Sequence, residues 1–169
     1  MTQAVAAVRS VADLLAVVRR QAEHAVDRYD ELAEAFAVSN NLDTEAAFRE
    51  LAESGRIFAA EIPPPAEAPG PLPAWGDLYP EISDPDSVHY LMPPWHAFDL
   101  AWRHEAQALA LIEAQATGSP DPLIRAAAAE LAGRQQLRVE AILARRDAQP
   151  QPPPGWWEDQ DGPNWDSEF

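Results

Sequence analysis

The sequence contains no cysteine, which excludes a disulfide scaffold, thiolate metal sites and thiol catalysis. No uninterrupted apolar run approaches the roughly 18 residues that a membrane-spanning helix needs. The N-terminal stretch MTQAVAAVRSVADLL has neither the basic start nor the cleavage-like site of a secretory signal. We therefore expect a cytoplasmic protein that has no membrane partner.

Basic side chains are also scarce: there are 12 of them against 28 acidic ones, so the formal net charge is −16. Such a surface repels phosphate backbones, and we expect no nucleic-acid partner. It suits a basic protein partner or cations. The same charge also serves ordinary solubility, and composition alone does not separate these alternatives.

The positions of the prolines divide the chain into segments. None lies between Met1 and Ile62, many lie between Pro63 and Pro94, and another group begins at Pro150. The chain of 169 residues, 47% of them hydrophobic, is long enough for one domain with its own core. Proline-free blocks therefore predict four helices in two αα-hairpins, joined by a proline-rich crossover at about residues 63–92 and packed as an antiparallel four-helix bundle.

Helical spacing and capping signals set the predicted boundaries. Ser10 followed by Asp13 is a capping-box arrangement for the first helix, and Asp43 or Thr44 is expected to cap the second. The third helix is expected to start in the segment MPPW, because proline suits a first turn. The fourth opens at residues 120–122 and runs to about residue 146, with Leu131, Leu137 and Ile142 among its core residues. We predict an all-α domain at residues 1–148 and an extended tail at 149–169.

Three segments resemble the rubrerythrin-type branch of the ferritin-like superfamily. They are RYDELAEAFAVSNNLDTEAAFRELA, VHYLMPPWHAFDLAWRHEAQALALIEAQA and SPDPLIRAAAAELAGRQQLRVEAIL. A weak internal repeat, ELAESGRIFAAEI against ELAGRQQLRVEAI, agrees with a bundle of duplicated hairpins. The resemblance implies a ferritin-like fold with a di-iron or similar carboxylate centre. In that centre, the first and third helices each supply a glutamate, and the second and fourth each supply a Glu-x-x-His pair.

Most of the residues at those ligand positions cannot bind a metal as the family does. Only the third helix keeps its carboxylate, at Glu105, and the remaining positions fall on Ala22, Gly55, Phe58, Gln135 and Arg138. The resemblance therefore implies a degenerate di-metal site without catalytic residues. A glycine inside a helix costs about 1 kcal/mol relative to alanine. We expect Gly55 to make room for Phe58 or Arg138.

The remaining carboxylate has three possible environments. Glu105 and Arg138 can form a buried Arg–carboxylate fork in place of the metals. Alternatively, Arg138 extends to solvent and Glu105 stays partly exposed. A third possibility is a relocated metal site made of Glu23, His24, His104 and Glu105, which requires the first and third helices to lie side by side.

The C-terminal stretch PQPPPGWWEDQDGPNWDSEF combines a stiff proline run with tryptophans and acids. Disordered tails are usually poor in aromatic residues, so these side chains are expected to bind a surface. That surface belongs to this bundle, to a homodimer mate or to a separate protein. The candidate partner-binding residues are Trp156, Trp157, Glu158, Asp159, Trp165 and Phe169.

These observations favour a non-catalytic ferritin-like protein that acts as a binding subunit or adaptor of a larger complex and needs no cofactor. The alternative is a rubrerythrin-like, metal-dependent oxidoreductase or iron-handling protein that uses iron or manganese at a rearranged site around Glu105. The sequence has no phosphate-binding glycine loop and no nucleophile elbow.

Overall fold

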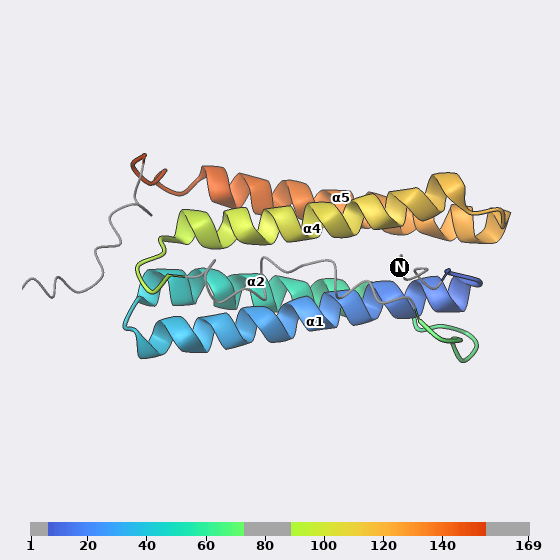
Figure 1. Ribbon diagram of the computed structural model, residues 1–169, viewed down its shortest axis with the longest axis horizontal. Coiled ribbons are helices and arrows are strands. Elements are labelled where there is room, and N and C mark those ends of the chain that lie inside the picture. Colours follow the sequence, from blue (N-terminus) through green and yellow to red (C-terminus); the bar gives the residue numbers. More distant parts are fainter. Residues whose placement is uncertain (1–6, 73–88, 155–169) are drawn as a thin grey trace, which may run out of the picture.

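The computed structural model describes residues 7–72 and 89–154. These residues form four α-helices and no strand: α1 (Val11–Val38), α2 (Leu42–Glu61), α4 (Pro94–Gly118) and α5 (Pro122–Asp147). Figure 1 shows the hairpin of α1 and α2 lying against the hairpin of α4 and α5. The all-α prediction of two hairpins is confirmed. The middle of the crossover, residues 73–88, lies outside the described residues, as do residues 155–169 of the predicted tail.

Three of the helix starts follow the expected chemistry. The side chain of Ser10 accepts a hydrogen bond from the backbone N–H of Asp13 at 3.0 Å. Proline occupies the first turn of both α4 and α5. At the start of α5, the carboxylate of Asp121 also accepts from the N–H of Leu123 at 2.8 Å.

The predicted cap of α2 is wrong. Asn41, rather than Asp43 or Thr44, is the N-cap residue, and its side chain accepts from the N–H of Thr44 at 3.3 Å. The reason is the backbone of Asn40, whose φ of 57° ends the turn in the left-handed region, which asparagine tolerates. The chain therefore re-enters helical geometry earlier than the sequence suggested.

The described ends of the crossover are attached to opposite ends of the first hairpin. Near its start, the N–H of Gly70 donates to the Asp13 carboxylate at 2.8 Å. Near its finish, the amide of Asn41 donates to the carbonyls of Tyr90 (3.0 Å) and Met92 (2.9 Å). These bonds attach the two described ends of the crossover to the first hairpin.

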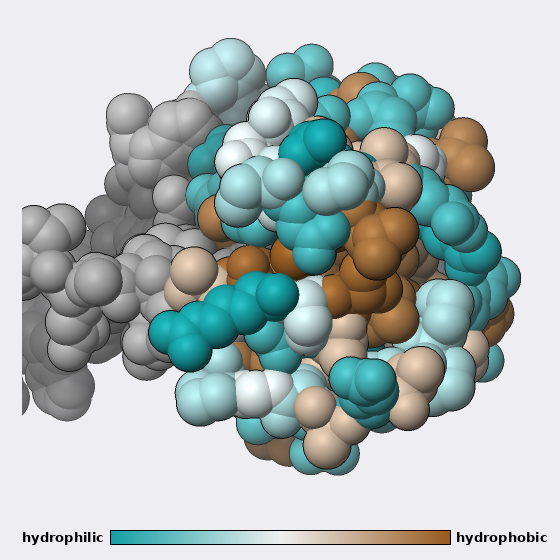
Figure 2. Space-filling view, turned by 90° about the vertical axis from the view of Figure 1, so that its right-hand side faces the viewer, coloured by the Kyte–Doolittle hydropathy of each residue, from teal (hydrophilic) through white to brown (hydrophobic). Residues whose placement is uncertain are grey.

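In the described part of the chain, the core consists of two apolar clusters, one toward each end of the bundle. One is built around Tyr29, Phe36, Phe48, Leu51 and Phe98, and the other around Leu14, Val17, Ile62, Ile112 and Ile124. Figure 2 faces the end of the bundle at which α1 begins, where hydrophobic residues are surrounded largely by hydrophilic ones. None of the four described helices is both long enough and apolar enough to cross a membrane.

The prediction that Leu137 is a core residue is wrong. Its side chain is 68% exposed, whereas Leu131, Gln135, Val139 and Ile142 form the buried face of α5. The buried face of α5 thus includes the polar Gln135, whereas the apolar Leu137 points outward. Because a buried polar side chain needs a hydrogen-bond partner, we expect a polar group of another helix opposite Gln135.

Candidate functional site

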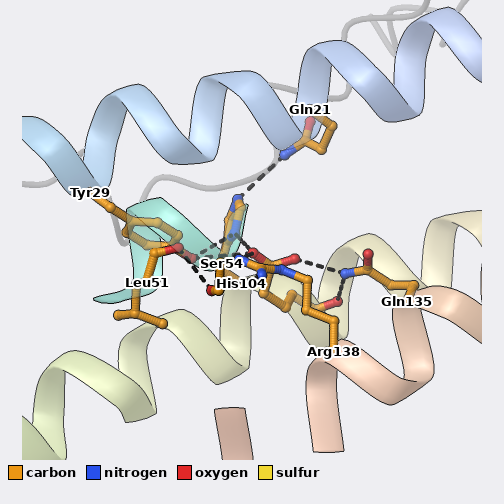
Figure 3. Close-up of polar contacts among 8 residues, drawn as sticks. Gln21, Tyr29, Leu51, Ser54, His104, Gln135 and Arg138 are labelled. Atoms are coloured by element: carbon orange, nitrogen blue, oxygen red, sulfur yellow. Dashed lines mark hydrogen bonds and ion pairs between the residues drawn. The ribbon is translucent and has the colours of Figure 1, made fainter. Parts of the chain in front are cut away.

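A buried group of polar side chains, here called the central polar cluster, lies between the two apolar clusters. All four helices contribute to it (Figure 3). Its members are Gln21 and Tyr29 of α1, Ser54 of α2, His104 and Glu105 of α4, and Gln135 and Arg138 of α5.

The carboxylate of Glu105 is at the centre of the cluster. Its Oε1 accepts from Nη2 of Arg138 at 3.1 Å and from the hydroxyl of Tyr29 at 3.4 Å. Its Oε2 accepts from Nε2 of Gln135 at 2.8 Å, and the same amide reaches the Glu105 carbonyl at 3.0 Å. Both carboxylate oxygens therefore have protein donors, as a buried charge requires.

Arg138 connects this carboxylate to α2. Its Nη1 donates to Oγ of Ser54 at 3.0 Å, and the guanidinium carbon lies 5.6 Å from the centre of the Phe58 ring. The side chains of Arg138 and Glu105 are only 8% and 7% exposed. They are therefore paired, which agrees with the first of the three alternatives and excludes the solvent-directed arginine. The contact is not a two-pronged fork, because the second guanidinium nitrogen binds Ser54.

His104 forms the side of the cluster nearest α1. Its Nε2 lies 3.3 Å from the amide nitrogen of Gln21, and its Nδ1 lies 3.5 Å from the Tyr29 hydroxyl. The same Nδ1 is 3.8 Å from Oε1 of Glu105. The imidazole thus links the glutamate to two polar side chains on the first helix.

The charge state of Glu105 follows from two opposed effects. Burial on its own would raise the pKa of this carboxyl group. The positive charge of Arg138, with the nearby imidazole of His104 and the hydrogen bond from Gln135, outweighs burial and holds the pKa well below its usual value of 4.5. Glu105 is therefore ionised at neutral pH, and the pair is a true ion pair.

Gly55 makes room for two side chains of this region. A Cβ atom at Gly55 would lie 2.7 Å from Cγ2 of Val26 and 3.3 Å from Nη2 of Arg138. Of the two expected side chains, Arg138 is the one beside Gly55, and the second close neighbour is Val26 rather than Phe58. Because residue 55 has no side chain, α1 can approach α2 closely and the guanidinium of Arg138 can lie beside it.

The ligand positions implied by the resemblance surround a very small space. A cavity of about 10 Å³ is lined by Ala22, Phe58, Glu105 and Gln135, among others. Within residues 7–72 and 89–154, no three His, Asp or Glu side chains gather in a way that could hold a metal ion. A lone carboxylate that is already bound by a guanidinium does not fit the donor set of a di-metal centre.

The four residues of the relocated metal site are not brought together. Glu23 and His24 are exposed on the outside of α1, whereas the side chains of His104 and Glu105 are buried. His24 instead lines a surface pocket with Asp27, Arg28 and Glu31. Long side chains of α1 and α4 do meet, through the contacts of Gln21 with His104 and of Tyr29 with Glu105, but Glu23 and His24 take no part in them.

Sequence reasoning did not identify Gln21, Tyr29 or Ser54 as members of the cluster. A signal for one of them was present: Gln21 interrupts the apolar series Leu14, Val18, Ala25 on the buried face of α1. The predicted partner-binding residues of the tail lie outside the described residues.

No protein-family model and no curated protein matches this chain. A solved structure does match: the 2.00 Å crystal structure of an uncharacterized conserved protein from Magnetospirillum magnetotacticum MS-1. The TM-score is 0.63 at 29% sequence identity, and the match covers 86% of this chain and 98% of that one. Together with the two hairpins and the long crossover, this likeness shows that the chain has the ferritin-like fold.

Proposed function

We propose that this ferritin-like protein is a non-catalytic binding protein, a subunit or adaptor of a larger complex, derived from a rubrerythrin-type ancestor. The observation that carries the proposal is the 3.1 Å contact between Arg138 Nη2 and Glu105 Oε1 inside the bundle. A guanidinium is permanently positive and has no lone pair to offer a metal. It supplies the positive charge that Glu105 would otherwise take from metal ions.

The neighbouring positions support the same proposal. Gln135 contributes a neutral amide, and its nitrogen donates to Glu105. Ala22, Gly55 and Phe58 have no donor atom for a metal in their side chains. Two metal ions in a low-dielectric interior need several carboxylates for charge balance, and this cluster provides one.

A binding role is supported by the charge and composition of the chain. The net charge of −16 would attract a basic partner over a long range. Tryptophans surrounded by charged residues are frequent hot spots of protein interfaces. The C-terminal segment contains three of the six tryptophans of the chain, at Trp156, Trp157 and Trp165. We propose this segment as the partner-binding element.

The test is affinity capture with three proteins. They are the full chain, a chain that ends at Gln149, and the full chain with Trp156→Ser, Trp157→Ser and Trp165→Ser. We expect the full chain to enrich a specific partner and both variants to lose it, with unchanged helical circular dichroism. Capture retained by the shortened chain would move the binding site to the bundle. No specific partner for the full chain would contradict the adaptor role.

A further inference from the structure

A surface groove of about 680 Å³ runs between α2 and α5. Its lining is mainly apolar and includes Phe58 of α2 and Phe98 of α4. Ile57 and Leu137, which also line it, are 55% and 68% exposed. Large apolar side chains that gather in an exposed depression are a common mark of a binding surface.

Long side chains, rather than close helix packing, connect α2 to α5. At one end, Nη2 of Arg145 lies 2.7 Å from a carboxylate oxygen of Glu50. At the other, Nη1 of Arg134 donates to the backbone carbonyl of Glu61 at 2.8 Å. From Arg134 to Arg145, the groove follows α5 for about 16 Å at the usual rise of an α-helix.

The charge of the groove differs from that of the whole chain. Arg134, Arg138 and Arg145 line it together with Glu50 and Glu61, and each of these arginines is paired with a glutamate (Glu130, Glu105 and Glu50, respectively), so the groove is close to neutral. The chain as a whole carries 28 acidic against 12 basic residues. An acidic segment with apolar side chains is therefore accepted better in this groove than on a surface of average charge.

The C-terminal segment of the chain has this composition. Residues 155–169 contain three tryptophans, Phe169, five acids and no basic residue. Pro152, Pro153 and Pro154, the last described residues, line a pocket with Trp95 and His96 of α4. Trp95 also contacts Arg146, the neighbour of the groove residue Arg145. The segment thus begins close to one end of the groove, and its 15 residues can span about 50 Å when extended.

We propose that the groove between α2 and α5 binds the C-terminal segment of the same chain. Tryptophan side chains fill the apolar part between Ile57 and Leu137, and acidic side chains face Arg134 and Arg145. This intramolecular contact goes beyond the proposed function and stands without it. A partner that binds the segment has to displace it from the groove.

The absence of cysteine allows a direct test with engineered pairs. One full-length variant carries Leu137→Cys and Trp157→Cys. The matched control carries Gln136→Cys and Trp157→Cys, because Gln136 is exposed at the same height of α5 as Leu137 but does not line the groove. We expect intramolecular disulfide formation in the first variant to be at least about tenfold faster than in the control. Equal rates, or disulfide-linked dimers as the main product, would overturn the proposal.

A second measurement needs no cysteine and uses a charge in the groove. In the full chain, Leu137→Glu should expose the C-terminal segment to chymotrypsin and speed its cleavage by about fivefold. Leu123→Glu should not, because Leu123 is equally exposed on α5 but does not line the groove. Identical cleavage of the two variants and the parent would overturn the proposal. Neither measurement involves a partner, so their failure is distinct from failure of the proposed function.

Discussion

The guanidinium of Arg138 lies 3.1 Å from the carboxylate of Glu105, and neither side chain is more than 8% exposed. Arg138 lies on α5 and Glu105 on α4, and Nη1 of the same guanidinium also reaches Ser54 on α2. Arg138 therefore links the two hairpins at the middle of the bundle, through the ion pair within one and the hydrogen bond to Ser54 of the other. Removal of the ion pair should affect stability more than that of any surface ion pair in the described part of the chain.

Arg138→Met should destabilise the bundle by about 3–5 kcal/mol, because Glu105 would remain as an unpaired charge in the interior. The double variant Glu105→Leu/Arg138→Met should recover most of this loss, since it leaves no buried charge. Urea denaturation of parent, single and double variants measures both effects. A double variant that is less stable than the single one would show that the pair contributes more than charge balance.

Stability should also depend on pH through Glu105. The pKa of this group is lower in the folded state than its ordinary value of 4.5. Its contribution is therefore complete above about pH 4.5 and is lost as the pH falls from there toward the folded pKa. Denaturation at pH 7, 4.5 and 3 should show the parent losing its advantage over Glu105→Gln in this acid range. The buried Asp13 also has a lowered pKa, but it is present in both proteins and cancels in the comparison. A difference that is independent of pH would contradict the assignment.

Two glycines, each inside a helix, give a matched pair of substitutions. Gly55→Ala should destabilise by about 1–3 kcal/mol, because its new methyl group would lie 2.7 Å from Val26. Gly133→Ala adds a methyl group with no atom within 4 Å and should stabilise by up to about 1 kcal/mol. Thermal and urea denaturation measure both. Equal changes in the free energy of unfolding for the two substitutions would show that the close contact between residue 55 and Val26 does not limit stability.

Asn41→Ala should cost about 1–2 kcal/mol, because the side chain caps α2 and also binds the end of the crossover. The control is Asp121→Ala, which removes the cap of α5 at Leu123. The loss at Asn41 should be the larger one, with faster amide exchange at Met92. Equal losses would mean that the bonds to the crossover add nothing.

The helices were predictable because proline and apolar spacing report on local structure. Ser10 and the proline starts of α4 and α5 behave as their local chemistry dictates. The start of α2 was not predictable, because it depends on whether Asn40 adopts a positive φ, which several residue types tolerate. Leu137 was assigned to the core because periodicity alone does not show which of two adjacent apolar rows faces inward.

The central polar cluster was predictable only in part. The resemblance pointed to Glu105 and Arg138, because both occupy ligand positions of the family. The contacts of His104 with Gln21 and Tyr29 join residues far apart in the sequence and depend on how α1 is rotated relative to α4. A local sequence pattern gives no information on this rotation of one helix relative to another. The same holds for Val26, which takes the space beside Gly55.

The most direct test is elemental analysis of the full chain purified from iron- and manganese-replete cells, alongside the variant Glu105→Ala. If Arg138 has replaced the metals, neither protein should contain iron or manganese in stoichiometric amounts. About one or two metal ions per chain in the parent, lost in Glu105→Ala, would contradict this and assign the cluster to a metalloenzyme.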